Sequence, residues 1–177
     1  LGNVLDLGVP SDGTVSTAKI VDANVTAAKM FSGFANGITE ADQWRLTATL
    51  SLTGGGTTAI TANLERNDTA GFSKIGTGMT QSSGVFTFPS TGIYEIYAFG
   101  NFYSSGNMAY ARVSIQTTTD NGSNYTLQSQ ANTHVNATYY NISTNNFIFD
   151  VTNTSTHKVK FTARHENNGN LEANTAA

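Results

Sequence analysis

The sequence contains no cysteine and few charged residues, and these two deficits exclude several classes of protein. Without cysteine there is neither a disulfide framework nor a thiolate metal site. Only 12% of the 177 residues are charged and the net charge is −3, so the composition gives no indication of a nucleic-acid-binding surface. We therefore expect neither a nucleic-acid partner nor a cofactor.

Long apolar runs are also missing. The longest run is a few residues, far short of the roughly 20 that a membrane-spanning helix needs, so we expect no membrane insertion. The sequence begins at Leu1 with no basic stretch ahead of an apolar one, as a secretory signal would have. The absence of an initial Met leaves open that the chain is a piece of a longer protein.

Small polar residues are what the sequence has in abundance. Thr, Asn, Ser and Gly make up 78 of the 177 residues. Such a composition is typical of disorder, but ten Phe and seven Tyr, most of them after residue 44, supply the apolar side chains that disordered chains lack. We infer a folded β protein with a small-polar, weakly charged surface.

Strand patterns begin at Trp44. The segment 44–51 alternates Trp44, Leu46, Ala48 and Leu50 with polar residues, which predicts a strand with one buried face. Further strand-like runs, separated by turn-forming residues, occupy 57–66, 84–103 with a break at 89–92, 109–119, 125–135, 145–152 and 157–165. Eight to ten strands at this spacing predict an all-β sandwich, and among sandwiches they favour a jelly roll.

The segment 83–102, SGVFTFPSTGIYEIYAFGNF, narrows this prediction. Phe86 and Phe88 share one face, Pro89 ends the strand, and Gly92 permits a turn into a second strand. This arrangement resembles the central signature of C1q/TNF-like domains, in which a strand, a Pro-containing turn and a Gly-x-Tyr strand recur. The resemblance covers roughly residues 42–166 in layout and implies a C1q/TNF-like jelly roll. The aromatic-rich ending of vertebrate members is missing.

The N-terminal part contains a ten-residue repeat. Segments 11–20 and 21–30 have Asp, Val, Ala and Lys at matching positions. Ten residues is not a whole number of helical turns, so a continuous amphipathic helix is excluded, whereas a short helix with an extended link and a strand-and-turn unit both stay open. Either unit exposes apolar residues that need other copies of the chain to cover them: Val15, Ile20, Val25 and Met30.

Repeats of the form Val-x-x-Ala-Lys-Ile/Met ahead of a compact β domain resemble the shafts of bacteriophage tail fibres and related virion fibres. That resemblance implies three chains around one axis and a C-terminal head that binds a target, and C1q/TNF-like heads are themselves typically trimers. We expect a homotrimer with a repeat arm and hinge at 1–40 and a jelly-roll head at 41–177, on the exterior of a virion. A flexible linker with a chance duplication is the competing interpretation of the arm.

A surface of Thr, Ser, Asn, Gly and Tyr offers hydrogen-bonding groups and flat apolar faces, which suit a glycan or a protein surface. The candidate residues are tyrosines at expected strand ends or loops and neighbouring amides. They are Tyr103, Tyr125, Tyr139, Tyr140, Asn101, Asn107 and Asn136. Each tyrosine has core or intersubunit packing as its alternative role.

The function predicted from these features is that of a virion fibre protein, which mediates adhesion to a host cell surface through a trimeric head. Three weak sites on one head would raise residence time without catalysis. The alternative is a head-fibre or capsid-decoration protein that its arm attaches to other virion structural proteins. A secreted cellular C1q-like adhesion module is a third class. The sequence identifies neither the host nor the receptor.

Catalytic patterns are incomplete. The segment 71–75, GFSKI, has Ile75 where the sharp turn of a nucleophile elbow needs a second Gly. Glu65 and Asp68 form the closest carboxylate pair, and we expect them to be a solvated surface pair. We therefore predict that the chain is not an enzyme.

Metal-binding patterns are incomplete as well. His157 and His165 have the parity of the inward residues in the strand at 157–165, so we expect packing roles, with a histidine ring around a threefold axis as the metal-binding alternative. Segment 119–124 has closely spaced oxygen ligands but no closing Glu, so a hairpin turn at Asn121 and Gly122 explains it better than calcium. We predict no metal site.

Overall fold

The computed structural model describes residues 37–173 of the chain. The chain divides between Thr39 and Glu40 into two units, and the fold described below is that of the second unit. The repeat at 11–30 and the expected arm contacts lie outside the described residues, so they stay predictions. These contacts are Val15, Ile20, Val25 and Met30.

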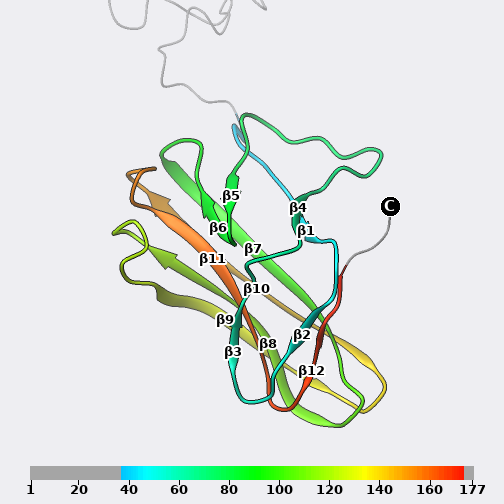
Figure 1. The fold of residues 1–177 in the computed structure, drawn as a ribbon. Helices are drawn as coiled ribbons and strands as arrows, with labels where there is room; N and C mark the ends of the chain where they lie inside the picture. Colours follow the sequence, from blue (N-terminus) through cyan, green and yellow to red (C-terminus); the bar gives the residue numbers. More distant parts are fainter. Residues whose placement is uncertain (1–36, 174–177) are drawn as a thin grey trace, which may run out of the picture. The chain divides into compact units, whose positions relative to one another are not determined.

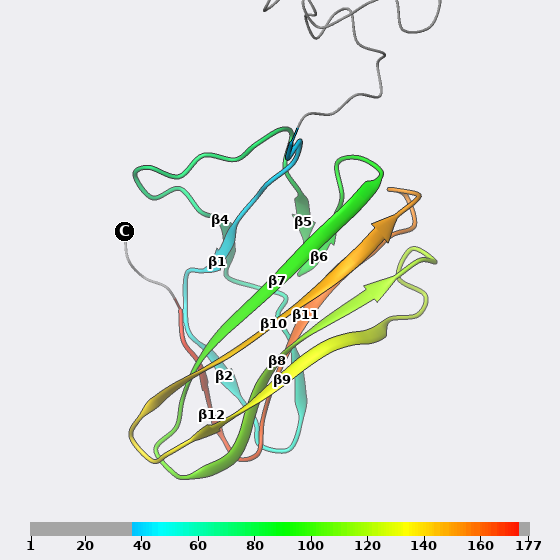
Figure 2. The same cartoon turned by 180° about the vertical axis from the view of Figure 1, so that it is seen from behind.

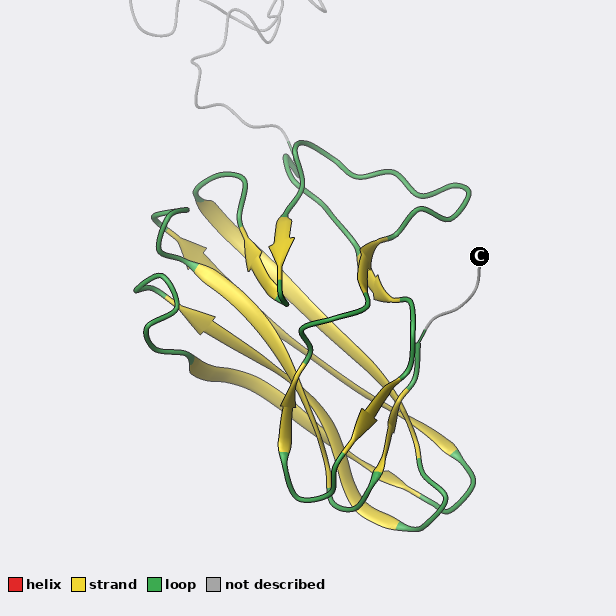
Figure 3. Ribbon diagram, viewed as in Figure 1, coloured by secondary structure: helices red, strands yellow, loops and turns green. Residues whose placement is uncertain are grey.

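Strands are the only regular elements in residues 37–173 (Figure 3). They are short before residue 92, and most are long after it. The twelve strands are β1 (Trp44–Leu46), β2 (Leu50–Leu52), β3 (Thr57–Ala59), β4 (Leu64–Arg66), β5 (Thr80–Ser82), β6 (Val85–Thr87), β7 (Gly92–Tyr103), β8 (Met108–Thr118), β9 (Thr126–Val135), β10 (Tyr140–Val151), β11 (Lys158–His165) and β12 (Gly169–Leu171). The prediction of an all-β fold is confirmed.

Eight of these strands form two antiparallel sheets in the order of a jelly roll. The β7–β10 sheet has the order β2-β12-β7-β10, and the β8–β11 sheet has the order β6-β11-β8-β9. When these eight strands are numbered 1 to 8 along the chain, the order is 1-8-3-6 in the β7–β10 sheet and 2-7-4-5 in the β8–β11 sheet. These two orders define a jelly-roll sandwich. The sheets form two layers in Figures 1 and 2. The remaining strands are peripheral: β5 pairs with β6, β3 with β11, and β1 with β4.

The core lies between the two sheets and is rich in aromatic rings. Phe86 of β6 is 3% exposed and contacts Trp44 and Phe161 edge-to-face, with ring centroids 5.3 and 5.6 Å apart. Phe88 packs in the same way on Phe149, at 5.7 Å. Full burial of a Phe side chain contributes roughly 1.5–3 kcal/mol, so such rings are the main apolar term in stability.

The predicted turn at 89–92 is confirmed. Phe86 and Phe88 are both buried, and the strand ends before Pro89. On the return strand, Ile96 and Ala98 point into the core. The Tyr94 hydroxyl closes the turn by donating a hydrogen bond to the Ser90 carbonyl at 3.0 Å. The residue pattern alone therefore located this strand-turn-strand unit.

The prediction of one strand over 44–51 is wrong. The segment forms β1 and β2, and Ala48 between them is exposed instead of buried. The break arises because the two halves have different partners: β1 pairs with β4, whereas β2 pairs with β12 in the β7–β10 sheet. The run at 57–66 is divided in the same way, because β3 pairs with β11 and β4 with β1.

The start of one further strand differs from the prediction, and two strands were not predicted. β10 begins at Tyr140 and not at residue 145, because it pairs with β7 along its whole length, from Tyr140 opposite Tyr103 to Val151 opposite Gly92. β5 and β12 were not predicted at all. Each has three residues, too few to show an alternating pattern, and each is defined by its neighbours in the sheet.

Candidate binding surface

Six of the seven predicted surface residues lie at one end of the sandwich. β7 and β9 end there, β8 and β10 begin there, and the loops 104–107 and 136–139 connect them. This loop end carries Asn101, Tyr103, Asn107, Asn136, Tyr139 and Tyr140. Two loops that are separate in the sequence, each crossing from one sheet to the other, therefore bring the tyrosines and amides together.

Hydrogen bonds between the two loops hold this end in place. The Ala137 N–H donates to Asn107 Oδ1 at 2.8 Å, and the Thr138 N–H donates to the Ser104 carbonyl at 2.8 Å. Asn136 Oδ1 lies 2.8 Å from His134 Nε2. Asn107 therefore braces the loop, and its acceptor oxygen is already used.

The tyrosines at this end present aromatic surface to solvent. Tyr103 and Tyr140 are directly opposite each other on β7 and β10, and their ring centroids are 5.0 Å apart. Tyr140 and Tyr139 are 62% and 67% exposed. Flat apolar rings with a hydroxyl at the tip, beside asparagine amides, can both stack on a ligand and hydrogen-bond to it.

Tyr125 does not belong to this group. It lies in the loop that joins β8 to β9, at the end of the sandwich opposite the loop end. Its ring centroid lies 3.8 Å from Lys160 Nζ. Partial burial and the negative charge of Asp120 raise the pKa of the Tyr125 hydroxyl. The cation–π contact gives Tyr125 a packing role, which was the alternative for each tyrosine, and Tyr125 lies apart from the other six candidates.

A second exposed surface was missed by the sequence analysis. The outward side chains of β7 and β10 include large apolar residues on adjacent strands, which we call the apolar outer face. Its members are Ile93, Tyr97, Phe99, Ile142 and Ile148, all at least 49% exposed. The face continues to the Tyr103–Tyr140 pair, so the loop end and the apolar outer face adjoin.

Little charge interrupts the apolar outer face. Among the outward residues of β7 and β10 only Glu95 and Asp150 are ionised, and the Glu95 carboxylate accepts a hydrogen bond from Asn146 Nδ2 at 2.9 Å. Desolvation of this face would therefore cost little. A signal was present in the sequence: β7 has apolar residues at both parities, which indicates that both of its faces pack against something.

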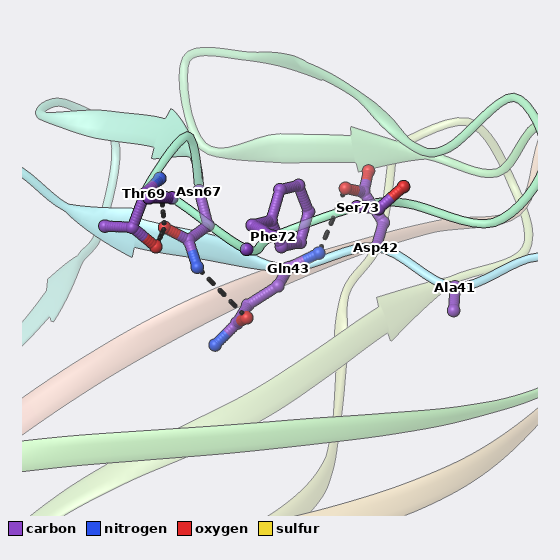
Figure 4. Close-up of a pocket in the computed structure, with 9 residues that line it drawn as sticks. Ala41, Asp42, Gln43, Asn67, Thr69, Phe72 and Ser73 are labelled. Atoms are coloured by element: carbon purple, nitrogen blue, oxygen red, sulfur yellow. Dashed lines mark hydrogen bonds between the residues drawn. The ribbon is translucent and has the colours of Figure 1, made fainter.

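A polar hollow of about 490 Å³ lies beneath the loop 67–73 (Figure 4). Its polar groups bond to one another. Asn67 Nδ2 donates to Gln43 Oε1 at 3.2 Å, and Asn67 Oδ1 accepts from the backbone and hydroxyl of Thr69 at 3.2 and 2.9 Å. The loop over the hollow is thus braced by its own hydrogen bonds, and the Ser73 hydroxyl donates to the Lys74 carbonyl at 3.4 Å.

Ion pairs account for the acidic residues near this hollow. Arg45 bridges Glu65 and Asp68 at 3.3 and 2.7 Å, so the predicted solvated carboxylate pair is a salt-bridged pair. Burial opposes ionisation of Asp42, but hydrogen bonds from Arg66, Trp44 and the Met79 N–H lower its pKa below the usual value. These carboxylates therefore stabilise the β1–β4 pair and its loop.

The histidines have the inward orientation that the parity predicted. His157 is nearly buried, and its ring nitrogens lie 3.3 and 3.1 Å from the hydroxyls of Thr152 and Thr156. His165 is fully buried against Phe102, with ring centroids 4.9 Å apart, and its nitrogens have no partner among residues 37–173. Desolvation lowers the His165 pKa.

The Asn121–Gly122 turn is confirmed, with both residues at positive φ. The Asp120 carboxylate accepts hydrogen bonds from Thr118 and from Asn124, which lower its pKa to about 2. No group of three metal-ligating side chains occurs in the described part of the chain. Nor does that part contain a helix that could cross a membrane.

Comparisons with known proteins find similar structures but no similar sequence. No protein-family model matches the chain, and no curated protein matches its sequence. Two solved structures that resemble it are crystal forms of murine APRIL, at pH 5.0 and pH 8.5. Both have a TM-score of 0.47. The pH 5.0 structure is 12% identical and matches 71% of this chain and 98% of the APRIL chain. The pH 8.5 structure is 11% identical and matches 76% of this chain and 91% of the APRIL chain.

Proposed function

We propose that the chain is a non-enzymatic adhesion head that assembles as a homotrimer through its apolar outer face and binds a glycan or protein on a cell surface with its loop end. The observation that carries the proposal is the exposure of five large apolar side chains on β7 and β10. These side chains are 49–69% exposed in the single chain, so covering each contributes about half to two thirds of the roughly 1.5–3 kcal/mol for full burial, which in sum offsets part of the entropic cost of association.

Threefold symmetry is the finer part of the proposal. It rests on the resemblance of segment 83–102 to C1q/TNF-like domains and on the repeat at 11–30, which resembles the shafts of virion fibres. In that setting the protein is a fibre on the exterior of a virion, and its arm binds other virion proteins. A head-fibre or capsid-decoration protein is the second candidate, because the same arm and head suit both.

Binding at the loop end is supported by Tyr139 and Tyr140, whose rings are exposed beside asparagine amides. Each site would be weak because it is shallow and uncharged. Three copies on one head, and many heads on one particle, multiply such weak binding by raising the effective concentration of the remaining sites.

The assembly is tested by light scattering on the full chain at micromolar concentration. We expect a mass three times that of the 18.7 kDa chain. Phe99→Asp places a charge in the apolar outer face and should give a monomer, whereas Gln130→Asp on the exposed side of β9 should leave the mass unchanged. A monomeric wild-type chain, or equal behaviour of the two variants, would contradict the proposal.

The adhesion role is tested by binding of the wild-type chain to immobilised neutral glycans, to host cells and to capsids. Tyr139→Ala should lower binding to glycans or cells at least tenfold, about 1.4 kcal/mol. Tyr125→Ala is the matched control at the other end of the sandwich and should bind as the wild type does. Binding to capsids alone, unaffected by Tyr139→Ala, would favour the decoration protein.

A further inference from the structure

The edge of β7 that faces away from β10 is largely unpaired. On this side β12 covers only Phe102 and Tyr103, and one further bond runs from the Glu172 N–H to the Asn101 carbonyl at 2.8 Å. Within residues 37–173, no strand pairs with this edge from Gly92 to Gly100.

The geometry of the ladder identifies which backbone groups are open. In an antiparallel strand the N–H and C=O of one residue point to the same edge, and neighbouring residues alternate. Because the Asn101 carbonyl points toward β12, the N–H and C=O of Phe99, Tyr97, Glu95 and Ile93 point to the open edge. These are the groups that an added strand would bond.

A cleft of about 880 Å³ runs beside this edge. Its floor is the apolar core, including Phe86, Ile96, Val113 and Phe161, and its far wall is formed by residues 40–46. Figures 1 and 2 both place β1 beside β7 with no strand between them. The cleft is therefore an opening into the sandwich along one side of β7.

The far wall also offers backbone groups. β1 bonds β4 through Gln43 and Thr47, whose partners are the Asn67 N–H and the Asn63 carbonyl. By the same alternation, the N–H and C=O of Trp44 and Leu46 point away from β4. A strand placed in the cleft would thus have unpaired backbone on both sides of it.

The open edge lacks the features with which proteins block edge pairing. Residues 92–100 contain no Pro and no Lys, and the pairing of β7 with β10 is continuous over all twelve residues, without a bulge. Proteins normally keep an exposed edge strand short, place charges on it or cover it, because a long bare edge recruits other strands. The single charge on this stretch is Glu95.

Three carboxylates set the charge of the rim. Glu40 accepts from the Thr77 and Gly78 N–H groups, Glu95 from Asn146, and Glu172 from Thr49. All these donors are neutral, and the ion pairs of residues 37–173 involve other carboxylates. The rim is therefore complementary to basic side chains that point out of the cleft.

We propose that this open edge is a strand-acceptor site for an extended peptide segment of a partner protein. The segment lies antiparallel to β7, its apolar side chains at every second position fill the cleft, and basic side chains between them face the acidic rim. Backbone hydrogen bonds supply affinity and the alternating side chains supply specificity, as in other cases of strand addition. The site uses the backbone edge of β7, whereas the apolar outer face uses the side chains of Phe99, Tyr97 and Ile93 on the same strand, so the two surfaces adjoin.

A tethered probe tests the site without depending on the affinity of an unidentified partner. A tail that continued the register of β12 would place position 174 opposite Phe99 and position 175 opposite the inward Ala98. One variant of the full chain, extended by two residues, carries Thr-Val-Thr-Val-Thr-Val at positions 174–179, which in that register would direct every valine into the cleft. The matched control carries Val-Thr-Val-Thr-Val-Thr, which has the same composition and the opposite facing.

Amide hydrogen exchange is the measurement. In the inward-valine variant we expect exchange at Phe99, Tyr97 and Glu95 to slow at least about tenfold relative to the wild-type chain, with little slowing in the control. The Ala98 and Ile96 amides already bond β10 and serve as an internal reference. Equal exchange in the two variants would overturn the proposal.

The wild-type chain supplies the second test. We expect its Phe99, Tyr97 and Glu95 amides to exchange rapidly at all concentrations. Slow exchange that does not depend on concentration would mean that another segment of the same chain occupies the edge, and slow exchange only at high concentration would mean that a second copy does. Either result would overturn a partner-protein site while leaving the adhesion proposal untouched.

Discussion

The outer face of the β7–β10 sheet carries isoleucine, tyrosine and phenylalanine, whereas the outer face of the β8–β11 sheet carries lysine and arginine. On β11 the outward side chains include Lys158, Lys160 and Arg164, and Arg112 lies opposite Arg164 on β8. Both guanidinium groups lie 5.6 Å from the ring of Tyr110. The two faces belong to one sandwich and share one core.

The two outer faces differ in how much it would cost to cover them with another protein surface. Covering the cationic face would require desolvation of four charges, which is costly unless each finds a partner. Covering the apolar outer face requires the desolvation of few polar groups. The proposed association between copies would therefore use the β7–β10 sheet, and the net charge of −3 conceals a cationic surface on the other sheet.

The largest expected effect contrasts the two faces of β7. Phe102 is fully buried and Phe99 is 58% exposed on the opposite face of the same strand. Phe102→Ala should lower the free energy of unfolding by about 3–5 kcal/mol, because it leaves a cavity. Phe99→Ala, measured by urea unfolding where the chain is monomeric, should change it by no more than about 0.5 kcal/mol. Similar losses of stability in the two variants would mean that Phe102 and Phe99 do not lie on the buried and the exposed face of β7, respectively.

The next effect contrasts the two faces of β11. Its outward residues include the half-buried cations Lys158, Lys160 and Arg164, whereas His165 points inward and desolvation holds its pKa below the ordinary 6.5. The unfolded chain then binds more protons than the folded one, so the stability from neutral His165 is complete above pH 6.5 and is lost as the pH falls below it.

Urea unfolding as a function of pH measures this dependence. His165→Phe removes the titrating group but keeps an aromatic ring in the core, and it should lose less stability than the wild type between neutral and mildly acidic pH. The exposed His134, replaced by Phe, is the control and should follow the wild type. Parallel curves for His165→Phe and the wild type would show that His165 is not a source of acid sensitivity.

The smallest expected effect concerns the cationic face itself. Arg112 and Arg164 are directly opposite on adjacent strands, an arrangement that is destabilising for like charges by a few tenths of a kcal/mol, about 0.2–1. Salt should therefore stabilise the wild type more than Arg164→Gln. Thermal unfolding at low and high salt measures this difference, and Lys74→Gln, remote from the arginine pair, is the control. An identical salt response in the wild type and Arg164→Gln would mean that the cations do not interact.

Part of the candidate site was predictable from the sequence. The tyrosines at 103, 139 and 140 lie at predicted strand ends or loops; the structure places all three at the loop end, where Tyr139 and Tyr140 are exposed and Tyr103 is half-buried. Tyr125 has the same local context, but Lys160, 35 positions further along the chain, covers its ring. A contact of that kind has no local signal, because neither residue's pattern records which ring the cation will meet.

The apolar outer face could not be located from alternation alone. β7 is apolar at both parities, so the sequence indicates cover on both faces without saying which face the same chain covers. The structure decides this, because β10 and β12 place Ile96, Ala98 and Phe102 against the other sheet. The division of 44–51 into β1 and β2 has the same origin, since two distant strands each claim half of it.

The sequence by itself determined what nearest neighbours in the chain control: the all-β class, the turn at 89–92, the Asn121–Gly122 turn and the inward parity of His157 and His165. Steric limits on proline and glycine and the two-residue period of a strand act over a few residues, so they can be read locally. Only the tertiary structure decided which strands share a sheet and where the edge of β7 stays open. Those features depend on pairings between distant segments, which no local pattern specifies.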